Sequence, residues 1–430
     1  MESVKQNKAV RLEPRPPFAY FAHNDPRKQG RAAKRSGSEA TRAQRGLGNT
    51  RIVLHDSSKP SNRQVRYDLR NVINDVSRLE RVRKCGRVPI GHFVSVRACE
   101  DGSRAGYSGL HTCGSVWACP VCAAKISARR TEELQEVLSH AEQDGYRASL
   151  LTLTMRHNAG DSLAVMWQAL SKAWGLVTSG KGWVQMKERI GLVGWARTVE
   201  VTHGAHGWHV HVHALLVSKS DPTLDILSAQ HVIGRWSAGL AKYGLESVAD
   251  SGGFDWECAA RGDGAALSAY VAKLGSSGLA AEATLGAFKT AKRGNRTPFQ
   301  IAQDIATTGD KADLALWWQY ERVSKGKRAL TWSKTLREYS KIKEISDEEI
   351  AAEQVGDEAV ALIRNRDWRE ARSYAGYLLD ICESEGVRGL WAALTRLEIP
   401  WELPELGAYS WGALSPPDRD FLRACVASNA

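Results

Sequence analysis

The chain has 430 residues, of which 43% are hydrophobic, enough for two or three domains whose cores need no disulfides. It has no uncharged apolar run of 18 residues, and its first residues are polar and basic, which argues against a membrane-spanning or secreted protein and predicts a cytoplasmic location. The net charge is +11, but the segment from residue 341 to the end carries −7, so the first 340 residues carry +18. This excess suits a polyanionic partner, although a basic surface can also serve solubility alone.

The first 75 residues are rich in Arg, Lys, Ser, Gly and Asn and show no sustained apolar period. A segment of this composition cannot bury enough apolar surface to offset the entropy lost on ordering. We therefore expect residues 1–75 to form a basic, mostly disordered arm.

Residues 76–145 hold five of the eight cysteines and then a helical pattern over residues 126–141. In a reducing compartment, clustered cysteines are more often metal ligands than disulfides. The segment CGSVWACPVC has the spacing of a structural zinc site and supplies Cys113, Cys119 and Cys122. The fourth ligand is open between Cys85, Cys99 and His111. A redox CxxC is the alternative, but no thioredoxin-like βαβ pattern surrounds this one.

Residues 146–295 change to strands and helices. The run ASLLTLTM predicts a short buried strand, and two β-rich runs on either side of a loop at residues 204–207 predict a hairpin. Strands, a hairpin and helices in one domain indicate an α+β fold.

The second run of the hairpin carries the most specific pattern of the sequence, three histidines at alternate positions in WHVHVHALL. In a strand, the period of two places His209, His211 and His213 on one face and the intervening valines on the other. One face can then hold a metal ion while the other packs into a core.

Pairing this strand with RTVEVTH predicts which residues oppose the histidines. If His203 pairs with Trp208, then Glu200 faces His211 across the hairpin. Two imidazoles and a carboxylate with open coordination positions suit Mn²⁺ or Mg²⁺ acting on a phosphate oxygen. A register shifted by one residue would move Glu200 to the other face.

An Ala-rich segment further along the chain predicts a helix from residue 265 to 274, with Asp263 as N-cap. It carries Tyr270 and, three residues on and hence on the same face, Lys273. A metal ion that polarises a phosphodiester needs a nucleophile, which Tyr270 offers, and Lys273 could steer the phosphate or protonate an oxygen.

In their order along the chain, the strand LLTLTM, the histidine strand and the segment AYVAKLG resemble the three motifs of the HUH endonuclease superfamily. The resemblance is greatest to rolling-circle replication initiators of small bacterial plasmids, of an actinobacterial type. It covers about residues 85–340, roughly 60% of the chain.

The resemblance implies an HUH-type catalytic domain over residues 146–295, with a central antiparallel sheet and flanking helices. It implies that His211 and His213 bind the metal ion, that His209 and Glu200 are nearby candidates, and that Tyr270 attacks DNA. Because the CG of RVRKCGRVP resembles the family's first cysteine, it also favours Cys85 as the fourth ligand of Zn²⁺.

The chain departs from the pattern at one position. Some relatives carry a glutamate one helical turn before the tyrosine, where this chain has Ala266. The residue that activates water at termination is therefore unassigned. The motif contains a single tyrosine, so a two-tyrosine transfer mechanism is unsupported.

Residues 296–430 read as a helical C-terminal region with an acidic tail, beginning with TPFQIAQDIA and KADLALWWQYERV. The acidic tail is not expected to touch DNA. A host protein, another subunit and the chain's own basic arm are its candidate partners.

The resemblance implies a site-specific, single-strand DNA endonuclease and strand transferase that initiates plasmid replication. Its partners would be plasmid origin DNA, single-stranded or hairpin DNA included, and a host helicase. A mobilisation relaxase or transposase is an alternative, although relaxases usually place the tyrosine before the histidines. A zinc-containing DNA-binding regulator without catalysis is the other.

Overall fold

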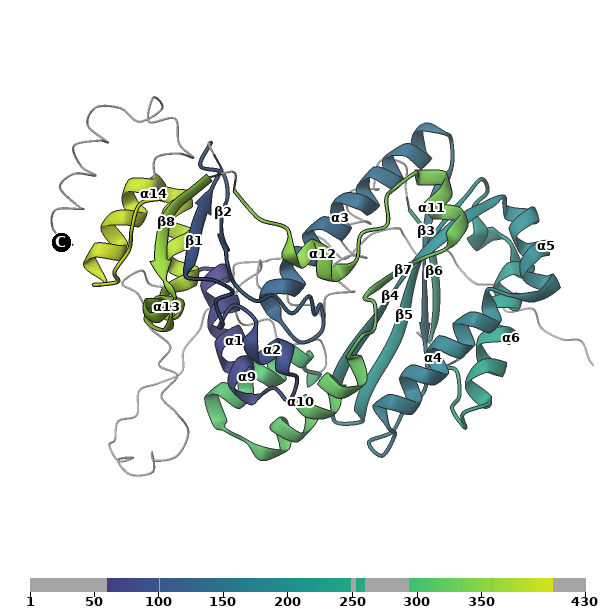
Figure 1. Ribbon diagram of the computed structural model, residues 1–430. Coiled ribbons are helices and arrows are strands. Elements are labelled where there is room, and N and C mark those ends of the chain that lie inside the picture. The colour runs from purple at the N-terminus through teal and green to yellow at the C-terminus, as the bar shows by residue number, and fades with distance from the viewer. Residues whose placement is uncertain (1–59, 100, 249–252, 260–293, 357, 405–430) are drawn as a thin grey trace, which may run out of the picture. The chain divides into compact units, whose positions relative to one another are not determined.

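The computed structural model describes residues 60–99, 101–248, 253–259, 294–356 and 358–404. They form two antiparallel sheets with helices packed against each, so the predicted α+β class is confirmed. The larger sheet has the strand order β6-β3-β5-β4-β7, and the smaller has the order β2-β1-β8 (Figure 1).

The larger sheet is built around a long β-hairpin. Its strands are β3 (Arg147–Thr154), β4 (Leu192–Gly204), β5 (Gly207–Ser218), β6 (Phe254–Cys258) and β7 (Leu330–Trp332). The hairpin of β4 and β5 turns at Ala205 and His206, next to Gly207 with φ +83°. A Cβ atom on Gly207 would lie 2.9 Å from Cα of Ala159, so both the backbone conformation and the close approach call for glycine.

Helices cover both faces of this sheet (Figure 1). On one face lie α4 (Leu163–Val177), α5 (Gly180–Ile190) and α6 (Ile226–Ala241), in the same apolar core as Val199, Val201, Val210 and Val212 of the hairpin. On the other face, α3 (Pro120–Gln143) and α11 (Lys334–Ser340) pack beside Leu215. The histidines lie further along β5, on this second face.

The smaller sheet joins segments that lie far apart in the sequence. Its strands are β1 (Phe93–Ala98), β2 (Ala105–Ser108) and β8 (Glu358–Arg364), and α13 (Asn365–Ala371) and α14 (Ala375–Arg396) contribute to the same apolar core. The sequence predicted a helical C-terminal region, but the structure places β7 in the larger sheet and β8 in the smaller one. Both are short strands, which periodicity does not separate from buried helix segments.

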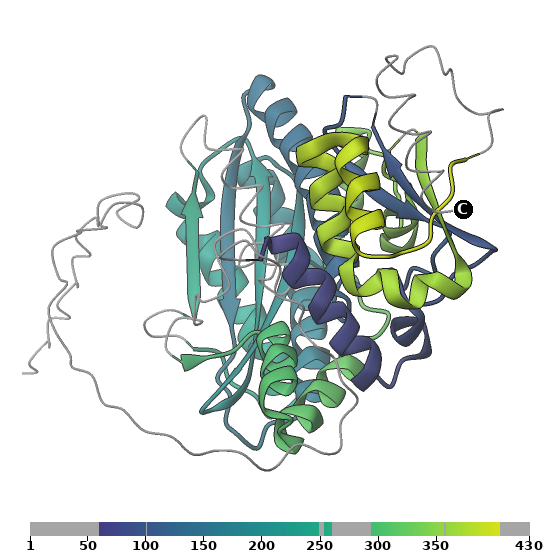
Figure 2. The ribbon, with the colours of Figure 1, turned by 90° about the vertical axis from the view of Figure 1, so that its left-hand side faces the viewer.

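Helix α1 (Asn62–Val76) was not predicted, because it lies within the segment expected to be a disordered arm. It begins at Ser61, whose side chain accepts a hydrogen bond from the amide of Gln64, and it buries Leu69 and Ile73. Figure 2 shows α1 beside α14 and α9, both of which it contacts. The other α-helices of the described residues are α2 (Glu80–Lys84), α9 (Pro298–Thr308), α10 (Lys311–Ser324) and α12 (Asp347–Ala352).

Candidate functional site

The register of the β4–β5 hairpin is the one predicted from the sequence. His203 pairs with Trp208, and Glu200 pairs with His211. The alternation of histidine with valine determines this register, because a shift of one residue would bury the histidines among the helices and expose the valines.

The Glu200 carboxylate joins two of the histidines. One carboxylate oxygen lies 2.8 Å from Nε2 of His211 and 3.2 Å from Nε2 of His213. Burial opposes ionisation of Glu200, but hydrogen bonds and the charges of the two histidines outweigh burial and hold its pKa well below its usual range. Glu200 is therefore a carboxylate at neutral pH.

These three residues could hold a metal ion, since one ligand atom from each lies within 4.8 Å of the others. Burial lowers the pKa of His213, which favours the neutral imidazole that a metal ion requires. Nδ1 of His211 is buried and has no hydrogen-bond partner within the described ranges. Two imidazoles and a carboxylate are a ligand set that a divalent cation binds.

His209 lies beside this group without belonging to it. Its ring stacks on His157, with centroids 4.9 Å apart, and its Nε2 is buried without a hydrogen-bond partner in the described part of the chain. Burial, together with neighbouring His211 and His157, lowers the pKa of His209 to about 4. His209 is thus a neutral imidazole at the edge of the candidate site.

Strand β3, which contains the first predicted motif, pairs with the histidine strand. Thr152 opposes His213 and Thr154 opposes His211. The Thr152 hydroxyl lies 3.0 Å from Nδ1 of His213. Neither Thr152 nor His157 was predicted to lie at the site. The alternation in LTLTM nevertheless places Thr152 and Thr154 on one face of β3.

Tyr270 and Lys273, the predicted nucleophile and its neighbour, lie outside the described residues, as does Ala266. Their proximity to the histidines therefore stays a prediction.

The four cysteines favoured by the sequence form a second group that could hold a metal ion. The sulfurs of Cys85, Cys113, Cys119 and Cys122 lie within 4.8 Å of one another, and all four residues are buried. Cys119 caps the N-terminus of α3 and Pro120 follows as its first residue, so the CPVC segment turns directly into the helix.

Of the three candidates for the fourth position, Cys85 is the one that lies with the other three cysteines. Sγ of Cys85 lies 3.7 Å from Sγ of Cys119 and 3.6 Å from Sγ of Cys122. Cys99 instead lines a separate cavity, and His111 is exposed, with its carbonyl accepting a hydrogen bond from Gly86. Backbone amides also donate to the sulfurs, from Cys113 to Cys85 and from Ser115 to Cys113.

Residues 108–221, which run from β2 to the end of the histidine hairpin, match the model of a family described as "Replication protein". Glu200, His211 and His213 lie within the match, and so do three of the four clustered cysteines. This segment is thus similar to the replication protein family.

Three curated proteins are similar to parts of this chain. A "Protein rep" of Streptomyces lividans is 30% identical over 290 residues, which cover 54% of this chain and 64% of the relative. A "Protein rep" of Streptococcus pneumoniae serotype 2 is 28% identical over 146 residues, or 33% of this chain and 42% of the relative. A "Neomycin resistance protein" of Streptomyces cyanogenus is 34% identical over 134 residues, or 25% of this chain and 31% of the relative.

The chain thus spans less than two thirds of each of these relatives. No solved structure matches the chain. None of the helices in the described ranges is long and apolar enough to cross a membrane.

Proposed function

We propose that the chain initiates rolling-circle replication of a plasmid by nicking one strand of the origin. Tyr270 would attack the scissile phosphate, leaving a 5′-phosphotyrosine link and a free 3′-OH that primes synthesis. The observation that carries this proposal is the Glu200–His211–His213 group, which lies within the segment matched by the replication protein family.

The arrangement around this group supports an HUH-type site. The histidine strand β5 is the middle strand of a five-stranded antiparallel sheet, with helices on both faces. His211 and His213 project from alternate positions, and Glu200 reaches both from the adjacent strand β4. The sheet would therefore hold three ligands on one face, and other coordination positions would be open to a phosphate oxygen.

Mn²⁺ or Mg²⁺ bound here would act as a Lewis acid on a phosphate oxygen. The chain's own residues prepare the site for it. His211 and His213 present Nε2 towards Glu200, and the ionised Glu200 carboxylate supplies the negative charge that a divalent cation needs.

Tyr270 supplies the covalent chemistry in this proposal. Its phenolic oxygen forms a bond to phosphorus, and the bond from phosphorus to the 3′ oxygen breaks, so the phosphodiester is replaced by a phosphotyrosine. The phenolic proton leaves and the 3′ oxygen gains a proton. Because the number of phosphate ester bonds is unchanged, the strand can be rejoined later. Lys273 would steer the phosphate or protonate an oxygen.

The cysteine group would have a different task. Four buried sulfurs fill the tetrahedral coordination of Zn²⁺ and leave no position open for substrate, which is typical of a structural site. Zinc bound by these four cysteines would then stabilise the N-terminus of α3, where Cys119 is the N-cap.

The nicking of single-stranded origin DNA tests the proposal. The chain should cleave the DNA when Mn²⁺ or Mg²⁺ is present, and His211→Ala and His213→Ala should each remove this activity. His206→Ala, in the exposed turn of the same hairpin, is the matched control and should cleave normally. DNA binding without cleavage at any metal concentration would instead favour a zinc-containing DNA-binding regulator.

A further inference from the structure

A cavity of about 220 Å³ lies on the face of the larger sheet that α4 covers, opposite the histidines. Strands β4 and β7, helix α4 and the segment before β7 contribute its walls. The polar and aromatic side chains that line it are Trp167, Ser171, Arg197, Lys327, Arg328 and Thr331. These described lining residues include three cations and no carboxylate.

Arg197 is the most informative of these residues. Its side chain projects from β4, and its Nε and Nη1 atoms are buried with no hydrogen-bond partner in the described part of the chain. Burial lowers the pKa of Arg197 to about 10, so the guanidinium stays charged at neutral pH. The guanidinium carbon lies 5.8 Å from the ring centroid of Trp174.

A buried cation without a partner is costly, and one that is kept usually has an anion to bind. A cation–π contact at this distance is weak and does not satisfy the N–H groups. The guanidinium presents a planar set of donors, which matches the oxygens of a phosphate group.

Two further cations, Lys327 and Arg328, lie at the mouth of the cavity on the segment before β7. Contacts of Lys327 hold this segment in place. The carbonyl of Lys327 accepts a hydrogen bond of 2.7 Å from Nε1 of Trp117, and Nζ of Lys327 lies 5.4 Å from the ring centroid of Trp167. Arg328 pairs with Glu344 at 3.1 Å, but both side chains are more than half exposed, so the pair is weak. Both cations are therefore available to an anion in the cavity.

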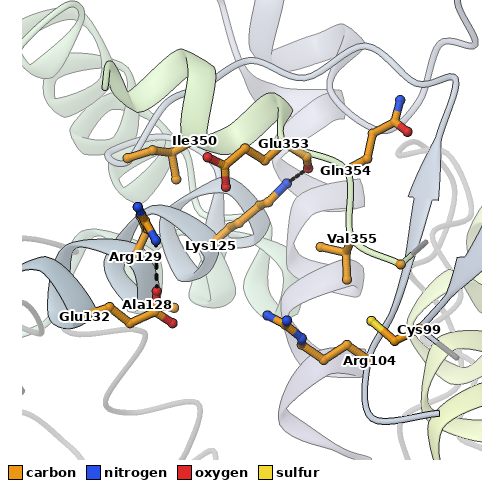
Figure 3. A pocket seen from close by; sticks show the side chains of 11 residues that line it. Cys99, Arg104, Lys125, Ala128, Arg129, Glu132, Ile350, Glu353, Gln354 and Val355 are labelled. Carbon is orange, nitrogen blue, oxygen red and sulfur yellow. Dashed lines mark hydrogen bonds and ion pairs between the residues drawn. The ribbon is translucent and has the colours of Figure 1, made fainter. Parts of the chain in front are cut away.

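The larger cavity of about 380 Å³ provides a contrast (Figure 3). It too is lined by basic residues, but there Lys125 donates to the carbonyls of Ala351 and Glu353, and Arg129 pairs with Glu132 at 3.5 Å. Lys125 and Arg129 have partners in the protein, and the carboxylates of Glu132 and Glu353 also line that cavity, so it does not call for an anionic ligand.

We infer that the cavity around Arg197 binds a phosphate group, held by Arg197 inside and by Lys327 and Arg328 at the mouth. Given the proposed function, on which this assignment rests, the phosphate belongs to the backbone of the bound DNA strand. Arg197 and Glu200 lie three residues apart on β4 but on opposite faces, about 10 Å along the strand. A DNA strand that passes around the edge of the sheet would thus contact both the Arg197 cavity and the Glu200 group.

Binding of a single-stranded oligonucleotide of about 16 nucleotides, measured over a range of salt with no added divalent metal, tests the inference. Arg197→Met should weaken binding about tenfold and reduce the slope of log K against log salt by about 0.7, the value for one phosphate contact on a single strand. Lys327→Met, at an exposed position, should reduce the slope in the same way. Lys242→Met, which removes an exposed lysine outside the cavity, should leave the slope unchanged.

Thermal unfolding separates a ligand site from a structural role. Arg197→Met should be at least as stable as the parent protein, because it removes a buried charge without a partner and keeps an apolar stem. If Arg197→Met unfolds and Lys327→Met leaves the slope unchanged, Arg197 is structural and the inference is overturned.

Inorganic phosphate tests the other source of the same chemistry. If phosphate stabilises the parent protein more than chloride does at equal ionic strength, and Arg197→Met removes the effect without altering DNA binding, the cavity binds free phosphate. If Arg197→Met changes neither the stabilisation by phosphate nor the binding of the oligonucleotide, the site is refuted. If the parent protein nicks DNA normally with metal but Arg197→Met leaves the salt slope unchanged, this phosphate site alone is refuted. If Arg197→Met reduces the salt slope but the parent protein does not nick DNA, the proposed function alone is refuted.

Discussion

Thr152 and Glu200 contact the two ring nitrogens of His213, one each. The Thr152 hydroxyl lies 3.0 Å from Nδ1, and the Glu200 carboxylate lies 3.2 Å from Nε2. A protonated Nδ1 can donate to the hydroxyl, which leaves the lone pair on Nε2, the nitrogen next to Glu200, for a metal ion. Partners of this kind set the orientation and tautomer of metal-binding histidines.

Thr152→Val should therefore weaken Mn²⁺ binding by about tenfold or more, because it removes the hydroxyl and keeps the shape of the side chain. Thr152→Ser should retain binding, and Thr154→Val is the control on the same face of β3. Titration calorimetry measures all three. Equal affinities in Thr152→Val and the parent protein would exclude this positioning role.

Glu200→Gln should lose nearly all affinity for the metal ion, because the amide keeps the size of the carboxylate but not its charge. The rise in melting temperature that Mn²⁺ gives the parent protein should disappear in this variant. Glu257→Gln, on the exposed side of β6, removes the same charge and should respond to Mn²⁺ as the parent does. A full Mn²⁺ response in Glu200→Gln would show that the ion binds elsewhere.

Cys119→Ser should lower the zinc content from about one ion per chain towards zero and destabilise the fold, because structural zinc binding contributes folding free energy. Cys99→Ser should leave zinc content and stability unchanged, since Cys99 lies outside the four-cysteine group. Elemental analysis and thermal unfolding give the two readouts. Zinc loss in Cys99→Ser would contradict the assignment of Cys85 as the fourth ligand.

Asp68 should make stability depend on pH. Burial raises its pKa from 3.8 to about 6, with nearby Arg70 acting in the opposite direction. The protonated carboxyl is favoured in the folded state, so this contribution is fully present below about pH 4 and is lost as the pH rises through about 6.

Asp68→Asn should thus be more stable than the parent protein at pH 8, by about 1–2 kcal/mol after allowance for solvent screening, and equally stable near pH 4. Glu136→Gln, an exposed carboxylate on α3, should show no such trend. Urea unfolding at the two pH values measures the difference. A larger gain at pH 4 than at pH 8 would reverse the sign and refute the account.

The part of the site that the sequence predicted correctly depends on local pattern. The two-residue period of WHVHVHALL and the short turn at residues 204–207 were enough to pair Glu200 with His211. Such a hairpin is local, so its register follows from its own residues.

The features that the sequence did not reveal depend on contacts between distant segments. Strand β8 pairs with β1, and Thr152 reaches His213 only because β3 lies beside β5. That Nε and Nη1 of Arg197 are buried without a partner among the described residues is likewise a property of the packed interior, since an arginine in a strand is expected from the sequence to be an ordinary exposed cation.

The most direct test of the central claim is to map the covalent link between protein and DNA. After reaction with origin DNA, digestion with nuclease and trypsin should yield one nucleotide-bearing peptide, residues 262–273, which follows Arg261 and ends at Lys273. Fragmentation should place the nucleotide on Tyr270, and Tyr270→Phe should give no such peptide while still binding DNA. A nucleotide attached to any other residue, or an adduct that persists in Tyr270→Phe, would contradict the account.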